Sequence, residues 1–188
     1  MPLLILDRDG VINEDSDTYV RNLEQWLPIP GSIEAIAKLS LAGFTIAVAT
    51  NQSGLARGYF SLDDMTEIHR ELNRLVEERG GKIAGVFYCP HLPGSGCNCR
   101  KPATGLLQAI ERDLNVSAAG AYFVGDSLKD LQAAQRYGCL PVLVETGKGR
   151  QTLASIRGPH PEINGPENIS VYADLAAAGD AILATSTL

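Results

Sequence analysis

Residues 3–10, "LLILDRDG", join a short apolar run directly to two aspartates and a glycine. Four consecutive apolar residues followed by a turn are typical of a strand that is buried on both faces of a parallel sheet. The two carboxylates then stand at the carboxyl end of that strand, where open parallel sheets bind their ligands. This stretch therefore predicts a fold class and the edge of the sheet at which a functional site lies.

The same alternation continues along the chain. Further apolar runs predict strands, and the amphipathic stretches between them predict helices that begin at caps such as Ser32 and Ser61. The predicted strands are 3–6, 44–50, 83–88, 121–126 and 141–146, with a short one near Ile169, and the predicted helices are 32–43, 61–81, 103–114, 127–138 and 174–184. Residues 147–168 lack a clear period and are predicted to form a surface loop.

Strands separated by helices predict an α/β fold. We expect a single three-layer, Rossmann-like domain, with a mainly parallel sheet and helices on both faces. The 188 residues suit one such domain, which we expect to run from 1 to 188.

Composition limits the classes of function. With 45% hydrophobic and 20% charged residues the chain is typical of soluble globular proteins, and no apolar run approaches the roughly 20 residues that cross a bilayer. The N-terminal residues lack the layout of a secretory signal, so we expect a cytoplasmic protein that binds no membrane. The net charge of −6 disfavours nucleic acids as partners, because that affinity comes mainly from Lys and Arg.

Residues 89–102, "CPHLPGSGCNCRKP", hold three of the four cysteines. The ligand types and spacing of Cys89, His91, Cys97 and Cys99 are those of a closed, tetrahedral structural zinc site, so we predict Zn²⁺ in a small loop insertion at 89–99. Free thiols are one alternative, a disulfide is disfavoured in a reducing compartment, and catalytic zinc would need an open coordination position. Cys139 is predicted to be a small buried residue outside this site.

Polar residues also follow the second and fourth predicted strands. "TNQSG" (50–54) suits an ordinary polar loop or a phosphate cradle, and "GDSLKD" (125–130) places Asp126 at a strand end and Asp130 where it could cap a helix. Asp7, Asp9 and Asp126 are predicted to converge, and such carboxylates repel one another unless a cation holds them. Oxygen ligands suit Mg²⁺, so the pattern indicates phosphoryl chemistry.

In their order and spacing, "DRDG", "TNQSG", "CRKP" and "VGDSLKD" resemble the haloacid dehalogenase superfamily of phosphatases. Within it, "DRDGVIN", "TNQSGLARGYF" and the cysteine loop are most similar to the phosphatases of heptose bisphosphates, and the resemblance extends to about residue 184. It implies catalytic Mg²⁺, structural Zn²⁺ and a small phosphorylated sugar as substrate. The implied reaction removes the C7 phosphate of a heptose 1,7-bisphosphate through an aspartyl-phosphate intermediate, for synthesis of ADP- or GDP-heptose.

The resemblance also implies roles for the catalytic carboxylates. Asp7 is the implied nucleophile, and Asp9 is the implied acid and base, with its backbone carbonyl on Mg²⁺ and its side chain free to be protonated. Asp126 completes the protein ligands of Mg²⁺.

Further residues are implied to handle the phosphates. Thr50 and Lys101 complete the catalytic set by stabilising the transferring phosphoryl group, and Arg100 grips the second phosphate. The residues implied to bind substrate are Asn51, Gln52, Ser53, Arg100 and Lys101.

Three rival functions remain open. The short zinc loop also resembles histidinol-phosphate phosphatase, which is the nearest alternative. A zinc-stabilised module that binds a phosphorylated metabolite without hydrolysing it would not need the whole set of Asp7, Asp9, Lys101 and Asp126. A phosphatase of nucleic-acid ends would need a basic groove, which the net charge opposes. We expect the enzyme to act as a monomer.

Overall fold

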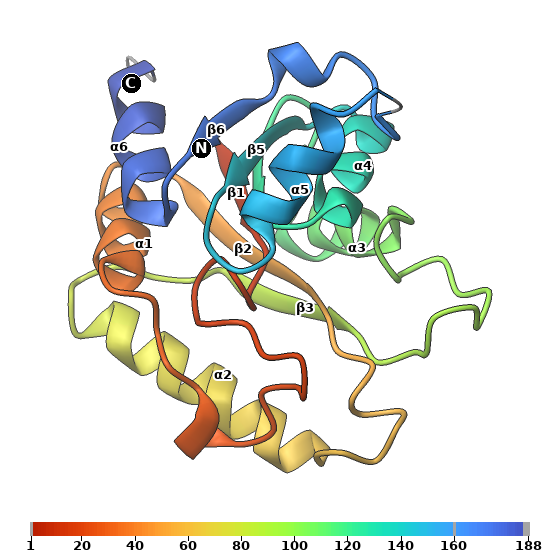
Figure 1. Cartoon of the computed structure of the whole chain (residues 1–188). Coiled ribbons are helices and arrows are strands. Elements are labelled where there is room, and N and C mark those ends of the chain that lie inside the picture. The colour runs from red at the N-terminus through yellow and green to blue at the C-terminus, as the bar shows by residue number, and fades with distance from the viewer. Residues whose placement is uncertain (1, 160, 186–188) are drawn as a thin grey trace.

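The computed structural model describes residues 2–159 and 161–185, and a six-stranded sheet forms its centre (Figure 1). The strands are β1 (Leu3–Leu6), β2 (Thr45–Asn51), β3 (Gly85–Cys89), β4 (Tyr122–Gly125), β5 (Leu140–Val144) and β6 (Ser170–Tyr172). Their order in the sheet is β3-β2-β1-β4-β5-β6, and every neighbouring pair is parallel. The predicted α/β fold is confirmed, and the chain reverses its direction of winding beside β1, where such sheets bind ligands.

Both faces of the sheet are apolar and both are covered by helices. In β1, Leu4 and Leu6 belong to the core on one face, while Leu3 and Ile5 belong to the core on the other. The first core is completed by α1 (Ser32–Leu41), α2 (Leu62–Glu77) and α6 (Leu175–Thr185). The opposite face is covered by α3 (Gly105–Leu114), α4 (Leu128–Tyr137) and α5 (Gly149–Ile156), as Figure 1 shows. Burial on both sides explains why the strands are continuous apolar runs.

One of the two predicted caps differs in the structure. Ser61 caps α2 and forms a capping box with Asp64. Ser32 is not a cap, because Gly31 (φ +84°) takes that position and the Ser32 hydroxyl donates to the backbone oxygen of Ile12 at 2.6 Å. The hydroxyl thus fastens the segment that follows Asp9 instead of closing the helix.

The prediction of a loop over 147–168 is wrong for two segments, α5 and the short 3-10 helix η2 (Pro166–Asn168). Gly149, Thr152 and Ile156 are the buried residues of α5, and their spacing is helical, but a glycine and a threonine gave no apolar period. The Thr152 hydroxyl donates to the backbone oxygen of Asp126 at 2.7 Å, so this helix braces a predicted site residue. His160, within the predicted loop, and residues 1 and 186–188 of the predicted domain lie outside the described residues.

Among the described residues, no helix is both long enough and apolar enough to cross a membrane.

Candidate active site

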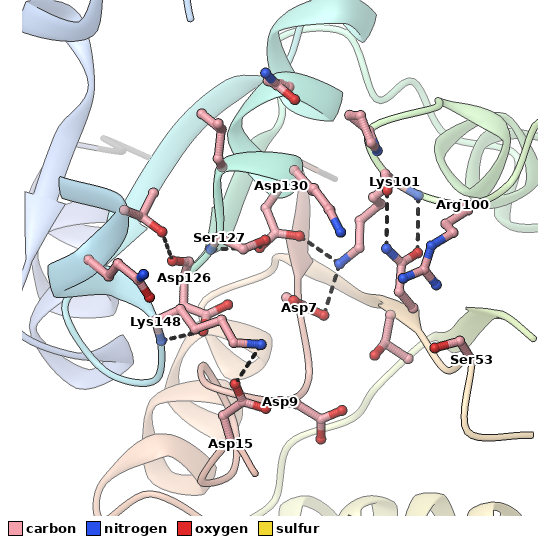
Figure 2. A pocket seen from close by; sticks show the side chains of 18 of the residues that line it. Asp7, Asp9, Asp15, Ser53, Arg100, Lys101, Asp126, Ser127, Asp130 and Lys148 are labelled. Carbon is pink, nitrogen blue, oxygen red and sulfur yellow. Dashed lines mark hydrogen bonds and ion pairs between the residues drawn. The ribbon is translucent and has the colours of Figure 1, made fainter. Parts of the chain in front are cut away.

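Three carboxylates meet at the carboxyl ends of β1 and β4 (Figure 2). Asp7 follows β1, Asp126 follows β4, and Asp130 lies in the first turn of α4; one oxygen of each lies within 4.8 Å of the others. Burial and the nearby Asp130 raise the pKa of Asp126 to about 7, and the same two causes raise the pKa of Asp7. The cluster therefore carries more negative charge than its surroundings favour. The third carboxylate of this group is Asp130, while Asp9 follows β1 as well and lines the same cavity as Asp7 and Asp126.

The surroundings of this cluster fit a small hard cation. Gly10 (φ +82°) and Gly147 (φ +54°) both approach the Asp126 carboxylate so closely that a Cβ on either would overlap it. Only glycine lets the two backbone segments close around the cluster. Carboxylate oxygens with adjacent backbone are the ligands that Mg²⁺ uses, together with water and substrate phosphate.

Lys101 compensates part of the charge. Its Nζ contacts Asp7 at 2.9 Å and Asp130 at 2.7 Å, and donates to the backbone oxygen of Ala49 at 2.7 Å, so its three protons have partners. Burial opposes its charge, but Asp130 and Asp7 outweigh burial and raise its pKa. Its peptide is fastened by Asn51, which accepts from the Lys101 N–H at 3.0 Å and donates to its carbonyl at 3.2 Å. Lys101 is a fixed, permanent cation beside Asp7.

The side chain of Asp9 accepts hydrogen bonds from three neighbouring side chains. Arg8 donates to it from Nε and Nη2, each at 3.0 Å, and Asn13 and Gln52 donate at 2.9 and 2.8 Å. Burial raises its pKa, but Arg8 and these hydrogen bonds outweigh burial and leave the pKa of Asp9 lowered. Arg8, which lies between the two aspartates, is buried and therefore needs an anionic partner, and Asp9 is that partner.

Two amides of the "TNQSG" segment organise the site. Gln52 donates from Nε2 to the Thr50 hydroxyl at 2.9 Å as well as to Asp9, and the side chain of Asn51 holds Lys101. The Thr50 hydroxyl, which accepts this bond, keeps its own proton for another acceptor. Ser53 lines the same cavity, with its hydroxyl 3.5 Å from that of Tyr19.

The carboxylates lie at the bottom of a cavity of about 630 Å³ that also has cationic residues in its wall. These are Arg100, Lys129 and Lys148. Lys148 donates from its backbone N–H to Asp126 at 2.8 Å, and its Nζ lies 3.1 Å from Asp15. Figure 2 marks both contacts with dashed lines. Burial and the positive charges of Arg100 and Lys148 lower the pKa of Lys129. An anion bound here would therefore be stabilised by cations that repel one another in its absence.

Sequence reasoning missed four of these residues. Asp130 was interpreted as a helix cap, which it is, because it accepts from the N–H and hydroxyl of Ser127, but it also pairs with Lys101. Lys148 and Asp15 lie in segments with no predicted element, although Lys148 follows the fifth strand, where the strand-end rule applies. Lys129 was visible only as a basic residue near Asp126.

The cysteine loop forms a second cluster. From Cys89, the Sγ of Cys99 lies at 3.1 Å, that of Cys97 at 3.8 Å and His91 Nδ1 at 3.5 Å, and Nδ1 is 3.2 Å from Cys99. All four donor atoms lie within 4.8 Å of one another, as four ligands of one tetrahedral zinc do. Cys139 lies outside this cluster, where it is buried and its thiol donates a hydrogen bond to the backbone oxygen of Ala118.

Comparisons with known proteins agree with this geometry. The HAD-hydrolase-like family model matches residues 98–165. The chain is 54% identical to the D-glycero-beta-D-manno-heptose-1,7-bisphosphate 7-phosphatase of Pseudomonas putida, over 94% of this chain and 97% of that protein. This chain belongs to the heptose bisphosphate phosphatase family. The resemblance to the haloacid dehalogenase superfamily is thereby confirmed.

Solved heptose bisphosphate phosphatases share the fold along its whole length. The enzyme of Bordetella bronchiseptica, crystallised with magnesium and phosphate, matches with a TM-score of 0.90 and 47% identity, covering 99% of this chain and 100% of that one. The enzyme of Burkholderia thailandensis matches with a TM-score of 0.72 and 36% identity, over 98% and 100% of the two chains.

In protein without Mg²⁺ but with its zinc, the carboxylate cluster should make the stability depend on pH. Because the folded-state pKa of Asp126 is raised to about 7, the folded protein holds a proton that the unfolded chain releases near its ordinary value of about 4. The stability from this proton is present at low pH and is lost as the pH rises through about 7. His69, whose pKa is lowered to about 4, acts in the opposite direction, but only below the unfolded value of about 6.5.

We therefore expect the Tm of the Mg²⁺-free protein to fall by about 2 to 4 °C between about pH 6.5 and pH 8. Over that interval the loss of the Asp126 proton alone lowers the free energy of unfolding by about 1 kcal/mol. Saturating Mg²⁺ should remove the fall, because the cation binds the ionised carboxylates. Calorimetry with and without Mg²⁺ measures both. A Tm without Mg²⁺ that stays constant across this interval would show that the cluster is already ionised without Mg²⁺.

Proposed function

We propose that this chain hydrolyses the 7-phosphate of D-glycero-β-D-manno-heptose 1,7-bisphosphate, the activity in the names of its relatives. The observation that carries the proposal is the position of Asp7, whose carboxylate lies beside the fixed Lys101 at the bottom of a cavity with three further cations in its wall. Charge of this sign and placement suits a substrate with one phosphate at the nucleophile and another at a distance. Identity of 54% over 94% of the chain supports the same substrate.

Asp7 acts as the nucleophile in this proposal. One of its carboxylate oxygens attacks phosphorus, the bond from phosphorus to the C7 oxygen breaks, and an aspartyl-phosphate forms. Lys101 and the Thr50 hydroxyl stabilise the charge on the phosphoryl oxygens. When bound by Asp7, Asp126 and the backbone carbonyl of Asp9, Mg²⁺ supplies further positive charge at the same oxygens.

Asp9 moves the proton between the two half-reactions. Its protonated carboxyl donates to the departing C7 oxygen, which leaves as the sugar hydroxyl. In the second step water attacks phosphorus, Asp9 takes a proton from that water, and the bond to Asp7 breaks to release phosphate. The proton gained there serves the next leaving group, and the two hydrogen bonds from Arg8 favour the ionised Asp9 that precedes deprotonation of water.

Arg100 binds the second phosphate in this scheme, with Lys129 and Lys148 as neighbours in the cavity wall. Ser53 lines the cavity and is assigned to the transferred phosphate, whereas the backbone N–H of Gln52 donates to the backbone oxygen of Cys89. The side chains of Asn51 and Gln52 hold Lys101, Thr50 and Asp9 in place.

The proposal extends to the whole chain. We infer that residues 1–188 form one phosphatase domain that works as a cytoplasmic monomer, binds neither membrane nor nucleic acid, and carries structural Zn²⁺ at 89–99. One sheet presents both clusters, since Cys89 ends β3 and pairs with Asn51 at the end of β2.

Turnover on three substrates tests the function. We expect β-heptose 1,7-bisphosphate to be the best substrate, ahead of heptose 7-phosphate and histidinol phosphate, and ³¹P NMR to identify heptose 1-phosphate as the product. Arg100→Ala should reduce the preference for bisphosphate over monophosphate by about 10 to 100-fold, because a charged hydrogen bond contributes roughly 1.5–3 kcal/mol.

Arg112→Ala, on the exposed surface of α3, is the matched control and should leave that preference unchanged. Heptose 7-phosphate as the product would overturn the regiochemistry. Better turnover of histidinol phosphate would favour the rival function.

A further inference from the structure

Arg8 is a buried cation with two partners. It separates the two aspartates of "DRDG", and only 1% of its surface is exposed. A buried guanidinium is strongly destabilising unless its donors are paired. One partner is Asp9, which it grips through Nε and Nη2, and the other is His69 of α2, whose Nε2 lies 3.1 Å from Nη1.

The contact with Arg8 determines the protonation state and the tautomer of His69. Guanidinium nitrogens only donate, so His69 must present a lone pair at Nε2 and carry its proton at Nδ1. A protonated imidazole would place a second cation against Arg8. Burial and the charge of Arg8 accordingly lower the pKa of His69 to about 4. The ring is therefore a neutral acceptor for Arg8.

The network beyond Arg8 reaches the phosphate site. Asp9 also accepts from Asn13 and Gln52, and Gln52 donates to Thr50 as well. The Asp9 carboxylate is thus oriented by three side chains, and Arg8, the only cation among them, is itself oriented by His69. His69 does not line the active-site cavity, so it acts on the reaction only through other residues.

We propose that His69 is a positioning residue that fixes the carboxylate of Asp9 through Arg8. The inference rests on the proposed function, in which Asp9 moves the proton. Without an acceptor at position 69, Nη1 loses its partner in a buried site and Arg8 must turn to find another. The carboxylate that it grips in two places turns with it, and a displacement of about 1 Å can cost about 10²-fold in rate.

The effect of a misplaced Asp9 carboxylate on the rate depends on the leaving group of the substrate. A sugar alkoxide departs poorly without a proton, whereas p-nitrophenolate departs without one. A misplaced Asp9 should therefore slow phosphoryl transfer from the sugar far more than transfer from p-nitrophenyl phosphate. A loss of general stability or of metal binding would slow both reactions alike.

Two substitutions of similar volume separate the acceptor from the packing. His69→Leu removes the acceptor, and His69→Gln keeps one in its amide oxygen. We expect His69→Leu to lower kcat/KM for the heptose bisphosphate by about 10 to 100-fold with KM nearly unchanged, and to lower kcat/KM for p-nitrophenyl phosphate less than about threefold. His69→Gln should restore most of the loss, and Arg70→Ala, on the exposed side of the same helix turn, should match the wild type.

Asp9→Asn, measured in parallel, separates this inference from the function beneath it. If Asp9→Asn shows no dependence on the leaving group, the proposed role of Asp9 fails. If Asp9→Asn shows the dependence and His69→Leu shows equal losses on both substrates or none, only the positioning role of His69 is overturned.

A measurement on the wild-type protein needs no variant. Long-range ¹H–¹⁵N NMR should show His69 neutral with its proton on Nδ1 near neutral pH. A protonated ring, or the tautomer with hydrogen on Nε2, would rule out the contact with Arg8 and the proposal with it.

Discussion

Replacing Asp7 with asparagine should lower phosphatase turnover by at least about 10⁴-fold, the order of loss that follows removal of a covalent nucleophile. The amide oxygen is a weak nucleophile and cannot carry the charge of an attacking carboxylate. The fold should survive, because Lys101 keeps Asp130 at 2.7 Å and Ala49 as partners, and the substitution removes one of three clustered charges. In metal-free protein we expect the Tm to be no lower than that of the wild type.

Steady-state phosphate release and mass spectrometry of acid-quenched enzyme test this together. The wild type should gain the mass of one phosphoryl group during turnover, and Asp7→Asn should not. Asp113→Asn, on the surface of α3, is the matched control and should retain full activity. If Asp7→Asn still turned over at more than about one hundredth of the wild-type rate, another group would have to be the nucleophile.

The sheet could be predicted because its strands are buried on both faces. Runs such as 3–6 and 44–50 have few interpretations other than central parallel strands, and the helices between them have strong periods. α5 was missed because its inward residues include Gly149 and Thr152. They are small and polar because the helix packs against the backbone beside Val144 and Asp126, a requirement that apolar periodicity does not reveal.

The site residues that directly follow a strand could be predicted from the sequence. Asp7 and Asp126 meet because both follow neighbouring strands, which strand order alone implies. The partners of Asp9 were not predictable, since they depend on the side-chain direction of Arg8 and on a helix 61 residues away. Likewise, the ion pair of Asp130 with Lys101 depends on the direction of the first turn of α4, which the local sequence does not determine.

Removing zinc should destabilise the protein and impair recognition of the second phosphate more than the chemical step. The ligands Cys89 and Cys99 close a loop of about eleven residues, and closing a loop of this order contributes about 3 kcal/mol. Arg100 follows the last ligand, and its Nη1 donates to the backbone oxygen of His91, itself a ligand, at 3.3 Å. The position of Arg100 is therefore tied to the loop that zinc holds.

Lys101 is one residue further on but is anchored differently. Asn51 holds its peptide through two hydrogen bonds, and Asp7, Asp130 and Ala49 hold its Nζ. These anchors belong to the sheet and to α4 and do not depend on the cysteine loop. Loss of zinc should thus release Arg100 while leaving much of the positioning of Lys101 intact.

Cys99→Ser tests whether zinc positions Arg100 but not Lys101. Cys139→Ser, which changes a thiol outside the cluster, is the matched control. We expect Cys99→Ser to bind less zinc, to lose about 3 kcal/mol of unfolding free energy, and to raise KM for the bisphosphate by about 10-fold or more with a smaller loss of kcat. Turnover of a monophosphate, which has no second phosphate for Arg100, should change less. Equal losses on both substrates would mean that zinc positions Lys101 as well, and unchanged recognition in a zinc-free protein would separate the cysteine cluster from the site altogether.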